Sequence, residues 1–152
     1  MAKILIDGIA GLKSLVGKDL GASEWREMKF EEIVKFADAT GDHQWIHVDT
    51  ERAKAGPFGT TIAHGYLTLS LIPMLGAQIY TVQGLSMGIN YGTNKVRFPK
   101  PVPVGSKVRA SADLVDVSDV AQGKQAVVRY TIEIEGEDKP ACVAETVVLL
   151  VP

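Results

Sequence analysis

Hydrophobic residues in the first half of the chain recur at the spacing of α-helices. Between residues 31 and 40, four apolar side chains fall on one helical face: Ile33, Val34, Phe36 and Ala37. Two glutamates open this segment, where the helix dipole favours acidic groups, and Gly41 is suited to end it. The pattern predicts a helix over residues 31–40, followed by a polar and aromatic loop at residues 42–49.

Residues 65–80 are the longest apolar stretch, and they are apolar around most of a helical circumference. A helix of this kind must be enclosed by other structure. Pro73 should kink it, because the ring removes one amide donor and crowds the carbonyl one turn earlier. The stretch is shorter than the roughly 20 apolar residues that cross a bilayer, so no membrane span is expected.

After Gly84 the spacing changes to the two-residue period of β-strands. Residues 108–114 and 126–134 alternate apolar and polar positions, and residues 143–151 are almost continuously apolar. Turn residues near positions 123 and 136 separate these segments, as in an antiparallel meander. The predicted fold class is α+β, a curved antiparallel sheet wrapped around one buried helix, because the helix and the sheet each need the other's apolar face.

Composition indicates an ordinary globular protein. The chain has 152 residues, of which 46% are hydrophobic and 22% charged; this argues against disorder and favours one domain over residues 1–152. Sixteen Lys and Arg against eighteen Asp and Glu give a net charge of −2. Such a charge provides no general attraction to nucleic acid or to anionic membranes, so neither is expected as a partner.

The single cysteine and the start of the chain indicate a reducing compartment. Cys142 has no intrachain partner, and its apolar, alternating surroundings are typical of a buried strand. Asp7 and Lys13 interrupt the apolar residues near the start, so no secretory signal is expected. The expected location is the cytoplasm.

The three histidines, His43, His47 and His64, lie within 22 residues of one another. Residues 43–47 approach the zinc-protease pattern HExxH, but Gln44 stands where that chemistry needs a glutamate base. The segment is predicted to be a loop, and no convincing set of further ligands accompanies it. No metal site is expected.

Asp42 and His47 form the constellation with the clearest chemistry. An aspartate and a histidine within reach of one water can polarise it and move its protons. Backbone amides at the start of the apolar helix, at His64 and Gly65, could hold an oxyanion. Together these groups suit the addition of water to a polarised double bond. The alternative is that Asp42 caps a turn and His47 is a packed loop residue.

Charge is distributed unevenly along the chain. No carboxylate occurs between Glu51 and Asp113, whereas cations crowd the end of that interval: Lys95, Arg97, Lys100, Lys107 and Arg109. This strip could bind the phosphates of a nucleotide-bearing ligand, with Lys95, Arg97 and Lys100 as the candidates. Lysines that protect a solvated sheet edge from aggregation explain it equally well.

Three segments resemble the MaoC-like family of (R)-specific enoyl-CoA hydratases. Residues 36–53 (FADATGDHQWIHVDTERA) resemble its hydratase motif, residues 63–68 (AHGYLT) its second signature, and residues 94–105 (NKVRFPKPVPVG) its third. The similarity is greatest to the branch named after nodulation protein N, which includes mycobacterial (R)-hydratases. The resemblance implies a hot-dog fold, a homodimer with two sheets joined edge to edge, and a tunnel for an acyl-CoA thioester.

The resemblance also assigns roles to single residues. Asp42 and His47 match the catalytic pair, and Gly65 matches the residue whose amide binds the thioester carbonyl. The family usually has Asn-Pro where this chain has Gln44-Trp45, and Trp45 is expected to narrow the acyl pocket. The expected oxyanion and substrate-binding group is therefore Gly65, His64, Trp45 and Gln44.

The implied activity is reversible syn hydration of a trans-2-enoyl-CoA to an (R)-3-hydroxyacyl-CoA. It needs no metal or redox cofactor, since the substrate itself carries coenzyme A. One alternative is dehydration of a 3-hydroxyacyl thioester on acyl carrier protein. The others are a hot-dog acyl-CoA thioesterase and a non-catalytic acyl-CoA binding protein.

Overall fold

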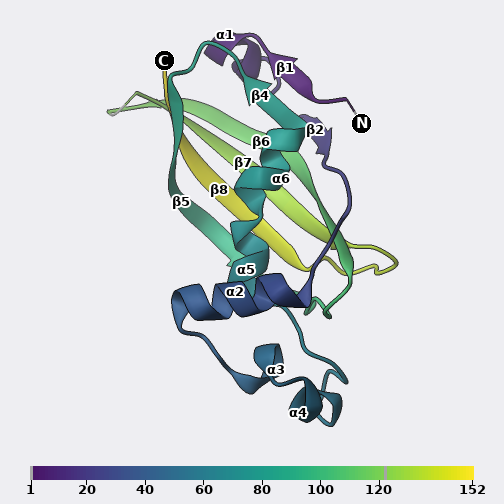
Figure 1. Ribbon diagram of the computed structural model, residues 1–152. Helices are drawn as coiled ribbons and strands as arrows, with labels where there is room; N and C mark the ends of the chain where they lie inside the picture. The colour runs from purple at the N-terminus through teal and green to yellow at the C-terminus, as the bar shows by residue number, and fades with distance from the viewer. Residues whose placement is uncertain (1, 122) are drawn as a thin grey trace.

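A six-stranded antiparallel sheet forms most of the computed structural model, which describes residues 2–121 and 123–152 (Figure 1). The strand order is β2-β6-β7-β8-β5, and β3 pairs with β6 beside β2. The strands are β2 (Asp19–Ala22), β3 (Arg26–Glu27), β5 (Met87–Arg97), β6 (Lys107–Val120), β7 (Gly123–Ile134) and β8 (Cys142–Val151). The antiparallel α+β architecture predicted from the sequence is confirmed.

Alternation along the long strands gives the sheet one buried face. In β6 the side chains at every second position from Val108 to Leu114 are almost fully buried, and β7 continues the pattern through Val128, Tyr130 and Ile132. Cys142 at the start of β8 is free and buried, as its surroundings in the sequence predicted. This face forms the core with the helices that cross it.

The predicted apolar helix lies across the sheet as two consecutive helices, α5 (Gly65–Ser70) and α6 (Ile72–Ile79) (Figure 1). The break falls at Leu71, and Pro73 occupies the first turn of α6, where its missing amide hydrogen costs no helical hydrogen bond. Gly76 allows α6 to approach β7 closely, because a Cβ there would lie 2.7 Å from the hydroxyl of Tyr130. The kink expected from Pro73 is therefore a change from one helix to the next.

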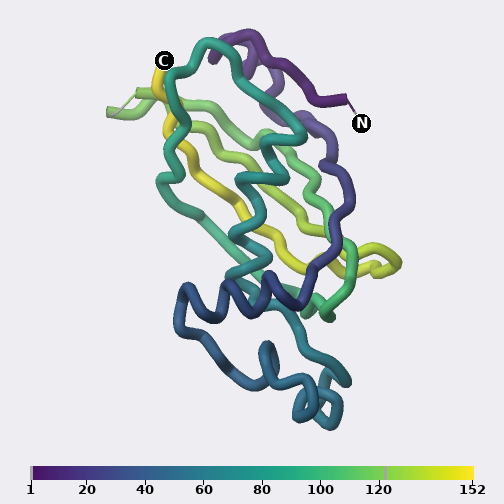
Figure 2. Tube along the Cα trace, viewed as in Figure 1, coloured from purple at the N-terminus to yellow at the C-terminus, as the bar shows by residue number. Residues whose placement is uncertain are grey.

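The remaining helices surround the ends of the sheet. Helix α1 (Gly8–Lys13) lies with a small parallel pair, β1 (Ile4–Ile6) and β4 (Tyr80–Val82), near the two chain termini. Helix α2 (Phe30–Thr40) packs near the start of α5, and Gly41 ends it with φ = 84°, as predicted. The chain after α2, which includes α3 (Trp45–Val48) and α4 (Thr50–Lys54), lies beyond the end of the sheet (Figure 2).

Two features differ from the expectations. The segment expected as a loop at residues 42–49 contains the short helix α3. The α5–α6 helices are also not fully enclosed, since Tyr66 and Met74 are exposed on one side. That side faces strand β5, in which every residue except Val96 is exposed. Among the described residues, no helix is long and apolar enough to cross a membrane.

Candidate active site

Asp42 enters the site directly after the end of α2. The left-handed conformation of Gly41 turns the chain there, and the Asp42 carboxylate accepts a hydrogen bond from the backbone N–H of Gln44 at 3.3 Å. This bond fixes the carboxylate at the start of α3. Asp42 therefore caps a turn, as one of the two interpretations of the sequence proposed. Its side chain is nevertheless exposed and lies close to His47 and His64.

His47 is buried on α3, and one of its ring nitrogens is already engaged. Its Nδ1–H donates to the backbone carbonyl of Ile62 at 2.7 Å, so Nε2 carries the free lone pair. Burial lowers the pKa of His47 below its ordinary value, although the Ile62 hydrogen bond and the charge of Asp42 act in the opposite direction. A neutral imidazole with a free Nε2 can act as a general base at neutral pH.

His64 lies directly behind His47. The two rings are stacked, with centroids 3.9 Å apart and planes inclined by 23°. The Nε2–H of His64 donates to the backbone carbonyl of Asp42 at 2.9 Å, across 22 residues of sequence. His64 is also the N-cap residue of α5, although its side chain makes no capping hydrogen bond, so its ring links Asp42 and His47 to the start of α5.

The three side chains converge on one small volume. One carboxylate oxygen of Asp42 and one ring nitrogen each of His47 and His64 all lie within 4.8 Å of one another. A water can bridge two polar atoms separated by up to about 5.6 Å, twice an ordinary hydrogen-bond length. The Asp42 carboxylate and the His47 ring can therefore share one water molecule.

The same cluster has a composition that suits a metal ion but an unfavourable geometry. Two imidazoles bind one ion when the lone pairs in their ring planes converge on it. Here the rings are stacked 3.9 Å apart and nearly parallel, so an ion in the plane of one ring would lie well outside the plane of the other. This arrangement suits a bound water better than a metal ion. The absence of a metal site stays a prediction.

A cavity of about 290 Å³ lies beside His47 and at the start of α5. Its lining is mainly apolar: His47, Phe58, Ile62, Ala63, Gly65, Thr68, Phe98, Lys100, Pro101, Val102 and Ala141. As the first residue of α5, Gly65 has an amide without an acceptor inside its helix. The cavity thus combines a base, a helix N-terminal amide and apolar walls.

Three of the four predicted substrate-binding residues, His64, Gln44 and Trp45, are not among the residues that line this cavity. Gln44 is exposed at the start of α3. Trp45 packs outward against α4, where the Arg52 guanidinium lies 4.3 Å from the centre of its ring and a Cβ on Gly56 would lie 2.9 Å from it. The Trp45 ring thus contacts Arg52 and the Gly56 segment and does not line the cavity beside His47, and its role in the acyl pocket stays a prediction.

The structure separates the three predicted phosphate-binding cations. Lys100 lines the cavity beside His47 and forms a 3.2 Å ion pair with Glu137. Lys95 and Arg97 lie on β5 and line a neighbouring hollow together with Tyr66 and Phe98. All three remain candidates for phosphate binding, and Phe98 lies between the two groups because it borders both hollows.

Phe58 and Phe98 are site residues that the sequence did not single out. Both are partly exposed aromatic side chains at the cavity, and the Phe98 ring lies so close to Gly65 that a Cβ there would be 3.1 Å from it. Each adjoins a proline in the sequence, in Pro57-Phe58 and Phe98-Pro99. Such pairs indicate loops, but they do not show which cavity a loop borders.

Comparison with known proteins identifies the family of the chain. The MaoC-like domain model matches residues 12–136. The chain is 59% identical to 3-hydroxyacyl-thioester dehydratase Z of Mycobacterium tuberculosis, over 93% of this chain and 95% of that protein. It is 42% identical to nodulation protein N of Rhizobium leguminosarum, over 93% and 90% of the two chains. Among solved structures, the (R)-hydratase from A. caviae superposes with a TM-score of 0.72 and 26% identity, covering 90% of this chain and 96% of that one.

The family match and the structural similarity place the chain among hot-dog proteins of the dehydratase type. The chain belongs to the MaoC-like domain family, and it is a dehydratase of the hydro-lyase class. The resemblance noted in the sequence is confirmed at the level of the family.

Proposed function

We propose that the protein catalyses reversible hydration of trans-2-enoyl thioesters to (R)-3-hydroxyacyl thioesters, with coenzyme A as the carrier. The observation that carries this proposal is the convergence of Asp42 and His47 within 4.8 Å, next to an apolar cavity that begins at Gly65. The (R) configuration is supported by the similarity to the (R)-hydratase from A. caviae.

In the proposed reaction, Asp42 and His47 hold one water. The neutral His47 ring accepts a proton through Nε2 as the water oxygen bonds to C3 of the enoyl group. Negative charge then develops on the thioester oxygen, where the amide of Gly65 donates a hydrogen bond. The proton that His47 accepted is then passed to C2, directly or through Asp42, so the elements of one water add across the double bond and both side chains return to their starting protonation states.

This chemistry uses only groups of the chain and the substrate. Protonation states of a carboxylate and an imidazole suffice for both proton transfers. The thioester supplies the electron-withdrawing carbonyl that makes C3 electrophilic. No metal or redox cofactor has a part in the proposal.

Dehydration on acyl carrier protein is the second candidate. The name of the mycobacterial relative, 3-hydroxyacyl-thioester dehydratase, describes the reverse direction and leaves the carrier open. Coenzyme A is favoured by Lys95, Arg97 and Lys100, because their side chains lie in or next to the hollows around Phe98 and could bind its phosphates.

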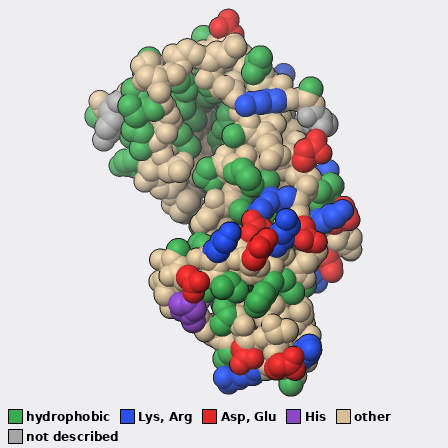
Figure 3. All heavy atoms as spheres, viewed as in Figure 1, with side chains coloured by type: hydrophobic (Ala, Val, Ile, Leu, Met, Phe, Trp, Pro, Cys, Tyr) green, Lys and Arg blue, Asp and Glu red, His purple; other side chains and the backbone are tan. Residues whose placement is uncertain are grey.

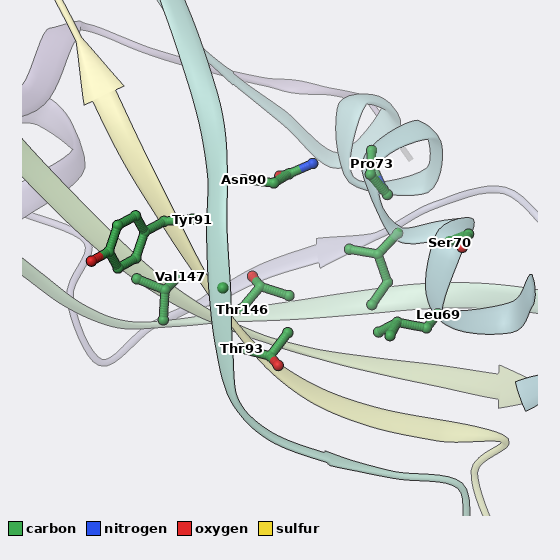
Figure 4. Close-up of a pocket in the computed structure, with 10 residues that line it drawn as sticks. Leu69, Ser70, Pro73, Asn90, Tyr91, Thr93, Thr146 and Val147 are labelled. Carbon is green, nitrogen blue, oxygen red and sulfur yellow. The ribbon is translucent and has the colours of Figure 1, made fainter. Parts of the chain in front are cut away.

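The open side of α5–α6 fits a second copy of the chain. Strand β5 is an unpaired sheet edge with large exposed apolar side chains, including Met87, Ile89 and Tyr91. A hollow of about 370 Å³ separates it from the helices, with Asn90 directed toward Pro73 and Tyr91 on the other side of the strand (Figure 4). Hydrophobic side chains are visible in this recess in the space-filling view (Figure 3). Pairing of β5 with its counterpart would form a homodimer and cover this surface.

The test is an absorbance assay of the purified protein with crotonyl-CoA and longer trans-2-enoyl-CoAs, with chiral analysis of the product and a colorimetric measurement of free thiol. The proposal predicts loss of the enoyl absorbance, an (R)-3-hydroxyacyl-CoA product and no thiol. Release of thiol would indicate a thioesterase. Turnover of carrier-protein substrates alone would replace coenzyme A by acyl carrier protein.

A further inference from the structure

We infer that His64 is a positioning residue that holds Asp42, His47 and the start of α5 in one arrangement, without contacting the substrate. The inference rests on the proposed function and deepens it. The sequence grouped His64 with the oxyanion and substrate-binding residues. Its surroundings in the structure indicate a different role.

The His64 ring is closed off from the cavity. Its residue is 2% exposed, and it is not among the residues that line the hollow beside His47. The ring is stacked on His47, and its centroid lies 4.9 Å from that of Phe36 on α2. A substrate in the cavity therefore meets His47 and Gly65, with His64 behind them.

Only one of the two ring nitrogens of His64 has a hydrogen-bond partner among the described residues. Nε2–H donates to the Asp42 carbonyl at 2.9 Å, whereas Nδ1 is buried and has no hydrogen-bond partner among the described residues. A phenylalanine or leucine would fill this space without burying an unpaired lone pair. What a histidine adds is the bond to Asp42, together with a flat ring against His47.

This bond connects parts of the site that are distant in sequence. Asp42 lies in a turn after α2, and its backbone position determines where its carboxylate reaches. The donor is on the residue immediately before Gly65, the proposed oxyanion group. His64 therefore fixes the distance from the carboxylate that holds the water to the amide that meets the thioester oxygen, and misplacement of reacting groups by about 1 Å can cost about 100-fold in rate.

Two substitutions separate the hydrogen bond from the ring. His64→Phe keeps a flat ring and removes the donor, whereas His64→Gln keeps an N–H of similar reach and removes the ring. We expect His64→Phe to lower kcat for enoyl-CoA hydration by about 10- to 100-fold, with KM changed less than about threefold. We expect His64→Gln to keep at least a tenth of the wild-type kcat and to be more active than His64→Phe, because it can still donate to Asp42.

Leu75→Val is the matched control for loss of packing. Leu75 is fully buried on α6 and lies outside the cavity beside His47, so this variant should have a lower melting temperature and an unchanged kcat. If His64→Phe does not fold, His64→Leu takes its place. If neither apolar variant folds, His64→Gln is the test. A folded His64→Gln variant with a kcat within about tenfold of the wild type supports the inference, and any other result refutes it.

A His64→Phe or His64→Leu variant with wild-type kcat would overturn the inference. So would a folded His64→Gln variant that is no more active than the apolar variant. A wild-type protein without hydration activity would instead refute the proposed function, so the two failures are distinguishable.

Discussion

Replacing His47 with glutamine removes the proposed general base and leaves a side chain of similar length in its place. In the wild-type protein, Nδ1–H of His47 donates to the Ile62 carbonyl at 2.7 Å and its ring stacks on His64 at 3.9 Å. Glutamine can still donate a hydrogen bond, but it cannot accept a proton from water at Nε2. His47→Gln therefore changes the chemistry more than the fold.

The loss of stability in His47→Gln can be compared with the loss of catalytic rate. Complete loss of the hydrogen bond to Ile62 would cost about 0.5–1.5 kcal/mol, and loss of ring stacking costs a similar amount, so the free energy of unfolding should fall by at most about 3 kcal/mol. Stabilities of about 5–15 kcal/mol are usual for folded proteins, and the variant should remain folded. Loss of a general base lowers kcat by about 10²–10⁴-fold, which corresponds to about 2.7–5.4 kcal/mol of the activation barrier.

The assay is hydration of crotonyl-CoA at neutral pH, with melting curves measured on the same samples. His43→Gln is the matched control, because His43 is exposed in the same segment and pairs with Asp38 at 2.9 Å away from the cavity. Its kcat should equal that of the wild type. The role of His47 as the general base is refuted if folded His47→Gln keeps kcat within twofold of the wild type, or if His43→Gln loses as much activity.

Three further predictions concern pH, packing and assembly. Because burial lowers the pKa of His47, the acid limb of kcat/KM should have its midpoint below about 6.5, the ordinary imidazole value; a midpoint above it would contradict the assignment. Gly76→Ala should lower the free energy of unfolding by up to about 2 kcal/mol, since overpacking against Tyr130 costs about 1–3 kcal/mol and helix propensity returns roughly 1 kcal/mol. Tyr130→Phe should recover most of this loss in chemical denaturation, and additive effects would contradict the contact. Tyr91→Arg should shift the protein to monomers in sedimentation experiments, whereas the exposed control Val16→Arg should not; a monomeric wild type would refute the proposed dimer.

Regular patterns made most of the fold predictable. Alternation from Val108 to Leu114 and again toward Ile134 identified β6 and β7, because one face of each strand is buried over its whole length. Helix α2 was predicted to within one residue at its start, since its apolar face and its terminal Gly41 are both local signals.

Short elements and side-chain directions were not predictable in this way. Helix α3 has four residues, little more than one helical turn, which is too short for a repeating hydrophobic pattern, and it forms where the Asp42 carboxylate accepts the N–H of Gln44. Trp45 was assigned to the acyl pocket from its position next to the catalytic motif. Its ring turns toward α4 because Gly56 leaves room there and Arg52 covers it.

The candidate site was also predictable only as far as local sequence signals reach. The residues Asp42 and His47 could be selected from the sequence, because their types and spacing suit the activation of water. Burial of His64 behind His47 depends on a contact between α3 and the start of α5, which are separated in the sequence by helix α4 and the loop that follows it. Proximity across such a distance is a property of the tertiary structure.

In the proposed reaction, Asp42 and His47 hold the water that adds to C3. A crystal structure of the Asp42→Asn variant with a bound trans-2-enoyl-CoA would locate this water. We expect the thioester oxygen at hydrogen-bond distance from the Gly65 amide, and one water in contact with both residue 42 and His47 Nε2, facing C3. An acyl group that lies in another hollow, with C3 remote from His47, would contradict it.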